Sequence, residues 1–284
     1  MTSINTNDGP VPGALSTPKQ VFAEGYEFSY LDIGQGEPLV LVHGSLLDYR
    51  YWLQIIPALA QSYRVIVISR RYHWPNAKPL GEFSYTSGEH TDDLIAILDA
   101  LNLGPVHLLG HSYAGYLAAR LISRRPDLVR SLILAEPGGP FEGEAPGRSR
   151  VADHNKAAAL ISAGNVAEGV AHFMDTICFD PCWKDCPKDY RQMTLDNAIT
   201  VTEQIKEIRP TITEADLRNC ICPTLLLGGA NTTSPFPETL DRIEELIPRA
   251  QRRSVSGASH LINQDNPKAF AELILSFING VAKL

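Results

Sequence analysis

The sequence predicts an α/β protein with a mostly parallel sheet, helices on both faces and an inserted, all-helical subdomain. Continuous apolar runs at 39–42, 64–69 and 129–135 are typical of strands buried on both faces. These runs alternate with segments whose apolar residues recur at helical spacing, which favours parallel strands joined by helices. The alternation stops between 138 and 217, where only helical patterns occur.

Composition indicates one soluble globular unit of 284 residues, 44% hydrophobic and 20% charged. The net charge of −7 argues against a nucleic-acid partner, because nucleic acids select basic surfaces. No apolar stretch approaches the ~18 residues of a membrane span, and the N-terminus lacks the pattern of a signal peptide. We therefore expect a cytoplasmic protein without membrane or nucleic-acid partners, acting as a monomer or homodimer.

The first half of the chain predicts a flexible tail over 1–20, followed by two antiparallel edge strands. A buried strand then ends in His43-Gly44-Ser45. The elements expected after it are a helix at 51–61, a strand at 64–69, a loop at 70–87, a helix at 89–103, the strand 106–109, a helix at 113–125 and the strand 129–135.

The second half predicts a helical cap followed by a return to the sheet. Cap helices are expected at 151–163, 166–177 and 189–208, and the later elements at 224–227 (strand), 237–247 (helix), 252–256 (strand) and 267–282 (helix). The core therefore comprises 21–137 and 218–284, and the cap comprises 138–217.

The most informative stretch runs from Gly110 to Ala114, between a predicted strand and a predicted helix. A G-x-S-x-G-like turn in that context lifts a serine hydroxyl clear of the sheet and requires small residues two positions to either side. Gly110 and Ala114 satisfy this requirement, although Ala114 departs from the strict motif. Ser112 is the predicted nucleophile.

A serine hydroxyl needs a base within hydrogen-bond reach, and imidazole has a suitable pKa. Among eight histidines, His260 is placed best, because it follows a predicted strand in Gly257-Ala258-Ser259-His260 and precedes the last helix. In an open parallel sheet the carboxyl ends of the strands meet at the ligand-binding edge. Ser112 and His260 are expected there together.

These motifs, with Val42-His43-Gly44-Ser45, resemble those of the α/β-hydrolase superfamily from residue 21 to the C-terminus. The resemblance implies the α/β-hydrolase fold and a triad acid, in most members an aspartate after the strand before the histidine strand. Here that slot falls near Thr232 and contains no carboxylate. Some members place the acid after the strand that follows the nucleophile helix, which selects Glu136, with Glu238 or Asp265 as weaker substitutes.

The resemblance also implies an oxyanion hole made of the backbone N–H groups of Ser45 and Tyr113. The expected function is a serine hydrolase that cleaves an ester, lactone or similar acyl bond of a small molecule, with no metal or other cofactor. Carbon–carbon bond hydrolysis, lyase or cofactor-free oxygenase chemistry, and a non-catalytic ligand-binding role remain open. Candidate substrate contacts are four residues near strand ends, at the serine turn or in the cap: Leu46, His111, Trp74 and Trp183.

Five cysteines, at 178, 182, 186, 220 and 222, lack the CxxC spacing of common metal sites. Reduced, partly buried thiols are the interpretation that the spacing favours.

Overall fold

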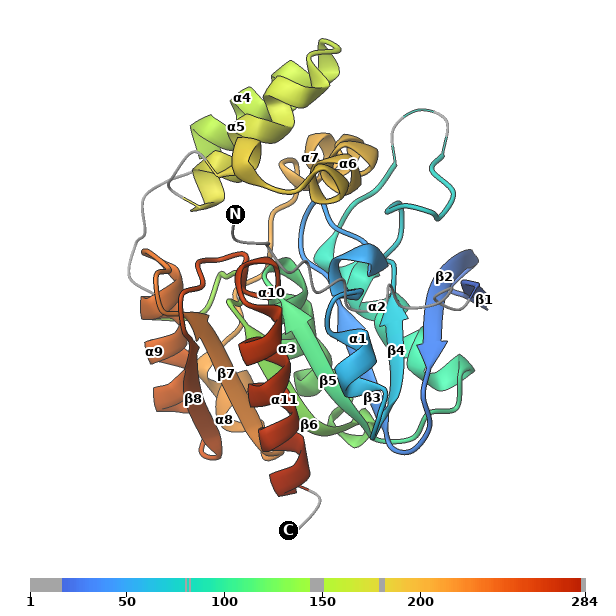
Figure 1. Ribbon diagram of the computed structural model, residues 1–284, viewed down its shortest axis with the longest axis vertical. Helices are drawn as coiled ribbons and strands as arrows, with labels where there is room; N and C mark the ends of the chain where they lie inside the picture. The colour runs from blue at the N-terminus through green and yellow to red at the C-terminus, as the bar shows by residue number, and fades with distance from the viewer. Residues whose placement is uncertain (1–16, 80, 82, 144–150, 179–181, 282–284) are drawn as a thin grey trace, which may run out of the picture.

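The computed structural model describes residues 17–79, 81, 83–143, 151–178 and 182–281, which form an eight-stranded sheet under a helical cap (Figure 1). The strand order is β1-β2-β4-β3-β5-β6-β7-β8, antiparallel at β1, β2 and β4 and parallel from β4 to β8. The strands are β1 (Lys19–Ala23), β2 (Tyr26–Ile33), β3 (Pro38–Val42), β4 (Arg64–Ile68), β5 (Val106–His111), β6 (Val129–Ala135), β7 (Thr224–Gly229) and β8 (Ala250–Val255). The predicted fold class is confirmed.

Helices cover both faces of the sheet, as the continuous apolar strands require. In β3, Leu39 and Leu41 pack into one hydrophobic cluster, and Val40 and Val42 into the other. The first cluster includes residues of α1 (Ile56–Leu59), α10 (Ile262–Asp265) and α11 (Pro267–Val281). The second includes residues of α2 (Ser87–Ala100), α3 (Tyr113–Arg124), α8 (Glu214–Arg218) and α9 (Phe236–Leu246).

The cap lies above the carboxyl ends of the parallel strands (Figure 1). It contains α4 (Val151–Ser162), α5 (Val166–Cys178), α6 (Lys188–Asp196) and α7 (Ile199–Gln204). The single helix expected over 189–208 is wrong, because the chain breaks at Asn197. The Asn197 amide bonds the Asp48 carboxylate at 2.7 Å and accepts the Trp74 N–H at 2.7 Å, so this break ties the cap to the core.

Several boundaries differ from those expected. Strand β1 begins at Lys19, so Lys19 and Gln20 belong to the sheet, while residues 1–16 of the expected tail lie outside the described residues. Strand β2 is not an edge, since it pairs with both β1 and β4. The chain rejoins the core before 217, where Ile212 bridges Phe141 and the unanticipated helix α8 packs on α3 and α9.

The helix expected over 51–61 is also wrong, since that region holds the 3-10 turn η1 (Tyr49–Trp52) and the short α1. None of the described helices combines the length and apolarity that crossing a membrane would need.

The turn between β5 and α3 requires a residue without a Cβ at position 110, which is Gly110. A Cβ there would lie 2.2 Å from the carbonyl oxygen of Ala114, closer than any real contact. The nearest atoms, in Ala114 and Gly115, belong to the backbone of the turn, so they cannot move away without opening the turn. The close passage of strand and helix therefore requires glycine at this position.

We predict that Gly110→Ala lowers the free energy of unfolding by about 3 kcal/mol, the upper end of the usual cost of overpacking. Chemical denaturation with urea measures the change. The matched control is Gly280→Ala on α11, where an added Cβ meets nothing within 4 Å. That control should be neutral or stabilising by up to about 1 kcal/mol, because alanine favours helix over glycine. Equal stability of Gly110→Ala and the wild type would contradict the packing argument.

Candidate active site

Ser112 sits at the sharp turn between β5 and α3, with a backbone φ of 53°. This conformation is rare for a residue with a side chain, and the surrounding backbone holds it in place. The Ser112 N–H donates to the Ala135 carbonyl at 2.9 Å, and the Ser112 carbonyl accepts the Gly138 N–H at 3.0 Å. One bond comes from the last residue of the neighbouring strand β6 and the other from the segment just after it, so this edge of the sheet fixes the position of the hydroxyl.

The structure places His260 against that hydroxyl, although 148 positions separate the two residues in the sequence. The His260 Nε2 lies 3.1 Å from the Ser112 Oγ. The imidazole is 4% exposed and stacks on the Phe236 ring, with 4.0 Å between ring centroids. His111 restrains the loop that carries His260, because the His111 Nε2 forms a hydrogen bond of 3.0 Å with the His260 carbonyl oxygen. The ring is therefore held in one orientation.

Glu136 supplies the carboxylate on the far side of the imidazole. Its Oε2 lies 3.2 Å from the His260 Nδ1, and its Oε1 accepts the Gly229 N–H at 2.7 Å. The side chain is fully buried, and burial raises the pKa of this carboxyl to about 7 against the opposing effect of the Gly229 hydrogen bond. Asp265, a weaker candidate, instead accepts the Ser259 N–H and hydroxyl at 2.7 and 2.6 Å.

The loop after β3 closes over Ser112 from the other side. Gly44 approaches so closely that a Cβ on it would lie 2.9 Å from the Ser112 Cβ. The next residue, Ser45, lines the same cavity as Ser112 and Tyr113. The two backbone segments expected to supply the oxyanion hole are thus adjacent.

Sequence reasoning missed Arg70, which is 2% exposed and lies beneath this loop. Its guanidinium donates to the carbonyls of His43 and Gly44 at 3.1 and 3.0 Å, and it lies 4.7 Å from the Tyr113 ring centroid. Arg70 therefore contacts both segments of the expected oxyanion hole. The sequence feature that could have indicated Arg70 is its place two positions after the buried end of β4, at the carboxyl edge of the sheet.

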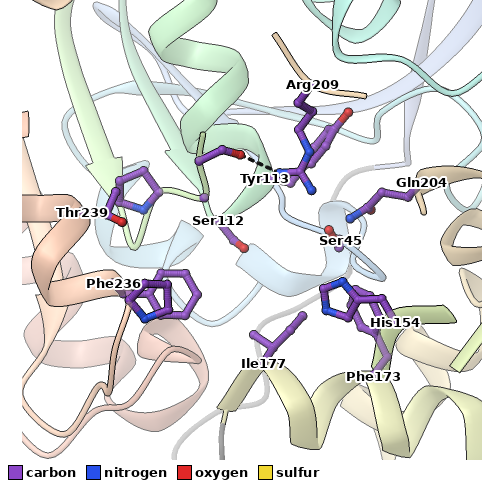
Figure 2. A pocket seen from close by; sticks show the side chains of 14 residues that line it. Ser45, Ser112, Tyr113, His154, Phe173, Ile177, Gln204, Arg209, Phe236 and Thr239 are labelled. Carbon is purple, nitrogen blue, oxygen red and sulfur yellow. Dashed lines mark hydrogen bonds between the residues drawn. The ribbon is translucent and has the colours of Figure 1, made fainter. Parts of the chain in front are cut away.

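A cavity of about 120 Å³ opens in front of the Ser112 hydroxyl (Figure 2). The cap contributes His154, Phe173, Ile177 and Gln204, and the segment after α7 contributes Arg209. The core side is lined by Ser45, Ser112, Tyr113, Pro137, Gly138, Gly139, Pro235, Phe236 and Thr239. A second space of about 10 Å³ adjoins it at Ser112, His260 and His111.

Three of the four residues expected to contact substrate do not line these spaces. Leu46 is fully buried in the core. Trp74 lies under the Arg50 guanidinium, 3.8 Å from its ring centroid, and Trp183 packs within the cap, where its Nε1 donates to the Thr194 hydroxyl at 3.0 Å. Each finds its partners within the protein, so only His111 reaches the Ser112 region.

The five cysteines carry free thiols. Within the described ranges, no group of three or more His, Cys, Asp or Glu residues is arranged to hold a metal ion.

Two curated proteins are similar to this chain over most of its length. The chain is 25% identical to a 2-hydroxy-6-oxo-2,4-heptadienoate hydrolase of Pseudomonas putida, over 98% of this chain and 99% of that protein. It is 27% identical to a pimeloyl-[acyl-carrier protein] methyl ester esterase of Aeromonas hydrophila, over 86% of this chain and 96% of that protein.

A solved structure shares the fold. The thermophilic esterase of Thermogutta terrifontis superimposes with a TM-score of 0.77 and 23% identity, over 94% of this chain and 99% of that one. Residues 39–273 match the sequence profile of the alpha/beta hydrolase family. With the fold, the sheet-edge site and this match over most of its length, the chain belongs to the alpha/beta hydrolase family, and it is a hydrolytic enzyme.

Proposed function

We propose that the protein is a serine hydrolase that cleaves an ester, lactone or similar acyl bond through an acyl-enzyme on Ser112. The observation that carries this proposal is the unbroken path of hydrogen bonds from the Ser112 Oγ through His260 to Glu136. Nucleophile, base and orienting acid within bonding distance of one another are what acyl transfer by serine requires. The cavity in front of Ser112 provides space in which a substrate carbonyl could approach the hydroxyl.

In the first half-reaction, the Ser112 Oγ attacks the carbonyl carbon while the His260 Nε2 takes the hydroxyl proton. The oxyanion that forms is bound by the N–H groups of Ser45 and Tyr113, each worth ~3 kcal/mol in comparable sites. Collapse breaks the bond to the leaving oxygen, which receives the proton from His260. Water then attacks the acyl-enzyme with His260 again as base, releasing the acid and restoring Ser112.

Glu136 acts through His260 rather than on the substrate. An ionised carboxylate at Nδ1 keeps the proton on that nitrogen, so Nε2 is free to accept the serine proton. The second carboxylate oxygen accepts the Gly229 N–H, which restrains the orientation of the carboxylate beside the ring. Glu136 is therefore a positioning residue in this mechanism.

We predict that a fluorophosphonate probe labels the wild type on Ser112 and that Ser112→Ala takes up no label. The physical reason is that only a serine deprotonated by a neighbouring base attacks the phosphorus. Mass spectrometry of the intact protein and of its peptides locates the adduct. Ser123→Ala, on the exposed face of α3, is the control and should label as the wild type does. A wild type that takes up no label would favour the non-catalytic, ligand-binding alternative.

For Glu136→Gln we predict a loss in kcat of about 10³- to 10⁴-fold, as for other triads that hold the wrong tautomer. The amide oxygen would keep the Gly229 bond, which turns the amide NH₂ toward His260 and moves the ring proton to Nε2. Steady-state hydrolysis of p-nitrophenyl acetate measures the change. Asp265→Asn is the matched control and should keep most of kcat, and a Glu136→Gln enzyme as active as this control would remove Glu136 from the mechanism.

The pKa of Glu136 also predicts how stability responds to pH. A carboxyl whose pKa rises from 4.5 unfolded to about 7 folded binds its proton more tightly in the native state. Its contribution to stability is therefore complete below pH 4.5 and is lost as the pH rises to 7. Wild type should lose stability relative to Glu136→Gln by up to about 1.4 kcal/mol per pH unit in this window. Urea unfolding of both proteins at pH 5 and pH 8 measures the difference, and a pH-independent difference would contradict the assignment.

One comparison favours a second function, the hydrolysis of a carbon–carbon bond. The compound in the name of the Pseudomonas putida relative contains a ketone and a carboxylate but no ester, and that relative aligns over nearly the whole chain. Turnover of a vinylogous diketone acid, without burst release from p-nitrophenyl acetate, would select this alternative. A burst with no turnover of the diketone selects acyl transfer to an ester.

A further inference from the structure

We propose that the substrate carries a carboxylate, bound by Arg209 and Gln204 at the cap side of the cavity. This inference rests on the proposed function and names its substrate class: the monoester or lactone of a small dicarboxylic or related acid. Both residues line the cavity that contains the Ser112 hydroxyl, and both side chains point into it (Figure 2).

Only some of the hydrogen-bond donors on the Arg209 guanidinium have partners within the protein. Its Nη1 donates to the Gly139 carbonyl at 2.8 Å, the bond drawn in Figure 2, and its Nε lies 3.5 Å from the Glu207 carboxylate. Among the described residues, none accepts a hydrogen bond from its Nη2. The side chain is 26% exposed, so this donor is open to a ligand.

A chain of hydrogen bonds fixes the orientation of the Gln204 amide. The Arg70 Nη1 can only donate, so the Tyr85 hydroxyl accepts from it at 2.9 Å. The Tyr85 proton then points to the Gln204 Oε1 at 3.4 Å. The amide nitrogen must face the other way, into the cavity, where no described residue accepts from it (Figure 2). Gln204 therefore offers a second donor beside Arg209.

The guanidinium and carboxylate groups around Tyr113 carry one excess positive charge. Arg70 and Arg209 lie 4.7 and 5.0 Å from the Tyr113 ring centroid, and the Tyr113 hydroxyl donates to the Glu207 carboxylate at 2.9 Å. Among the described residues, Arg70 has carbonyls, histidines and Tyr85 as partners but no carboxylate. Two guanidinium groups and one carboxylate leave a net charge of +1.

Three histidines in this region add nothing to that sum. Burial lowers the pKa of His43, His73 and His90 well below 6.5, and the nearby Arg70 lowers it further, so they are neutral at pH 7.

A carboxylate fits this end of the cavity better than a neutral group or a phosphate. Its two oxygens match two convergent donors, and its single negative charge matches the single excess positive charge. An apolar group would leave the Arg209 and Gln204 donors without acceptors, which costs far more than a lost apolar contact. A neutral acceptor would satisfy these donors but leave the excess positive charge unmatched. Phe173, Ile177 and Phe236 line the remainder of the cavity and suit the short carbon chain that separates the carboxylate from the ester.

The test compares two esters of nearly equal shape, mono-p-nitrophenyl glutarate and p-nitrophenyl 5-methylhexanoate, after subtraction of the uncatalysed rates. We expect the wild type to favour the charged ester in kcat/KM by roughly 10- to 100-fold, the value of one or two charge-assisted bonds. Arg209→Gln and the near-isosteric Gln204→Glu should each bring this ratio to 1 or below. Arg218→Gln, which removes an exposed positive charge on α8, is the control and should keep the wild-type ratio.

A wild-type ratio near 1, or an equal fall for both esters in Arg209→Gln and Gln204→Glu, would overturn the inference, because a merely structural role affects both esters alike. Calorimetry of monomethyl glutarate binding to Ser112→Ala tests the carboxylate site without catalysis. It therefore distinguishes failure of this inference from failure of the proposed function. Binding that is lost on adding Arg209→Gln supports the carboxylate site even in an enzyme that turns over neither ester. Binding unaffected by Arg209→Gln counts against it.

Discussion

The burial of one carboxylate organises the reactive edge of the sheet. Glu136 directly follows β6, accepts a backbone N–H from the end of β7 and contacts the imidazole that follows β8, so one side chain joins the ends of three neighbouring strands. Such a group is tolerated in a fully buried position only when its hydrogen bonds are satisfied. The ends of β6, β7 and β8 must therefore keep their relative positions, and the imidazole keeps its own as a consequence. Because β6 also bonds the Ser112 backbone, the nucleophile is tied to the same frame.

The segment after β7, where most family members carry the triad aspartate, has a different role in this chain. After β7 the chain turns toward β8, with the Ala230 and Asn231 N–H groups bonded to the Val255 and Ala258 carbonyls. This turn brings the Gly229 N–H to the Glu136 carboxylate, and even a Cβ on Gly229 would clash with the Ser259 carbonyl at 2.4 Å. Here the carboxylate, Glu136, follows β6. Strand β7, after which most family members carry the acid, provides the Gly229 N–H as a hydrogen-bond donor.

The sequence alone predicted the parts of the site that strand ends determine. Ser112 and Glu136 each follow a buried apolar strand, and His260 follows the more polar strand β8. Parallel strands bring their carboxyl ends together whatever lies between them. The cap was predictable as helical but not in its contacts, because an amphipathic pattern does not say which partner an apolar face will meet. Trp183 pairs with Thr194 inside the cap. The break at Asn197 depends on Asp48, 149 positions away in the sequence, and no local pattern reports such a partner.

Arg70 connects the two ends of the site. One part of its guanidinium holds the carbonyls of the loop that faces Ser112, and another part orients Tyr85 and through it Gln204. Carbonyl and hydroxyl oxygens satisfy its donors, and its positive charge has no carboxylate partner among the described residues, so negative charge that arrives nearby would be stabilised. Two such charges belong to the proposed reaction: the oxyanion that forms at Ser112 and the carboxylate of the substrate. In the proposed reaction the same buried cation would favour binding of an acidic substrate and stabilise its transition state, which would couple substrate choice to the chemistry.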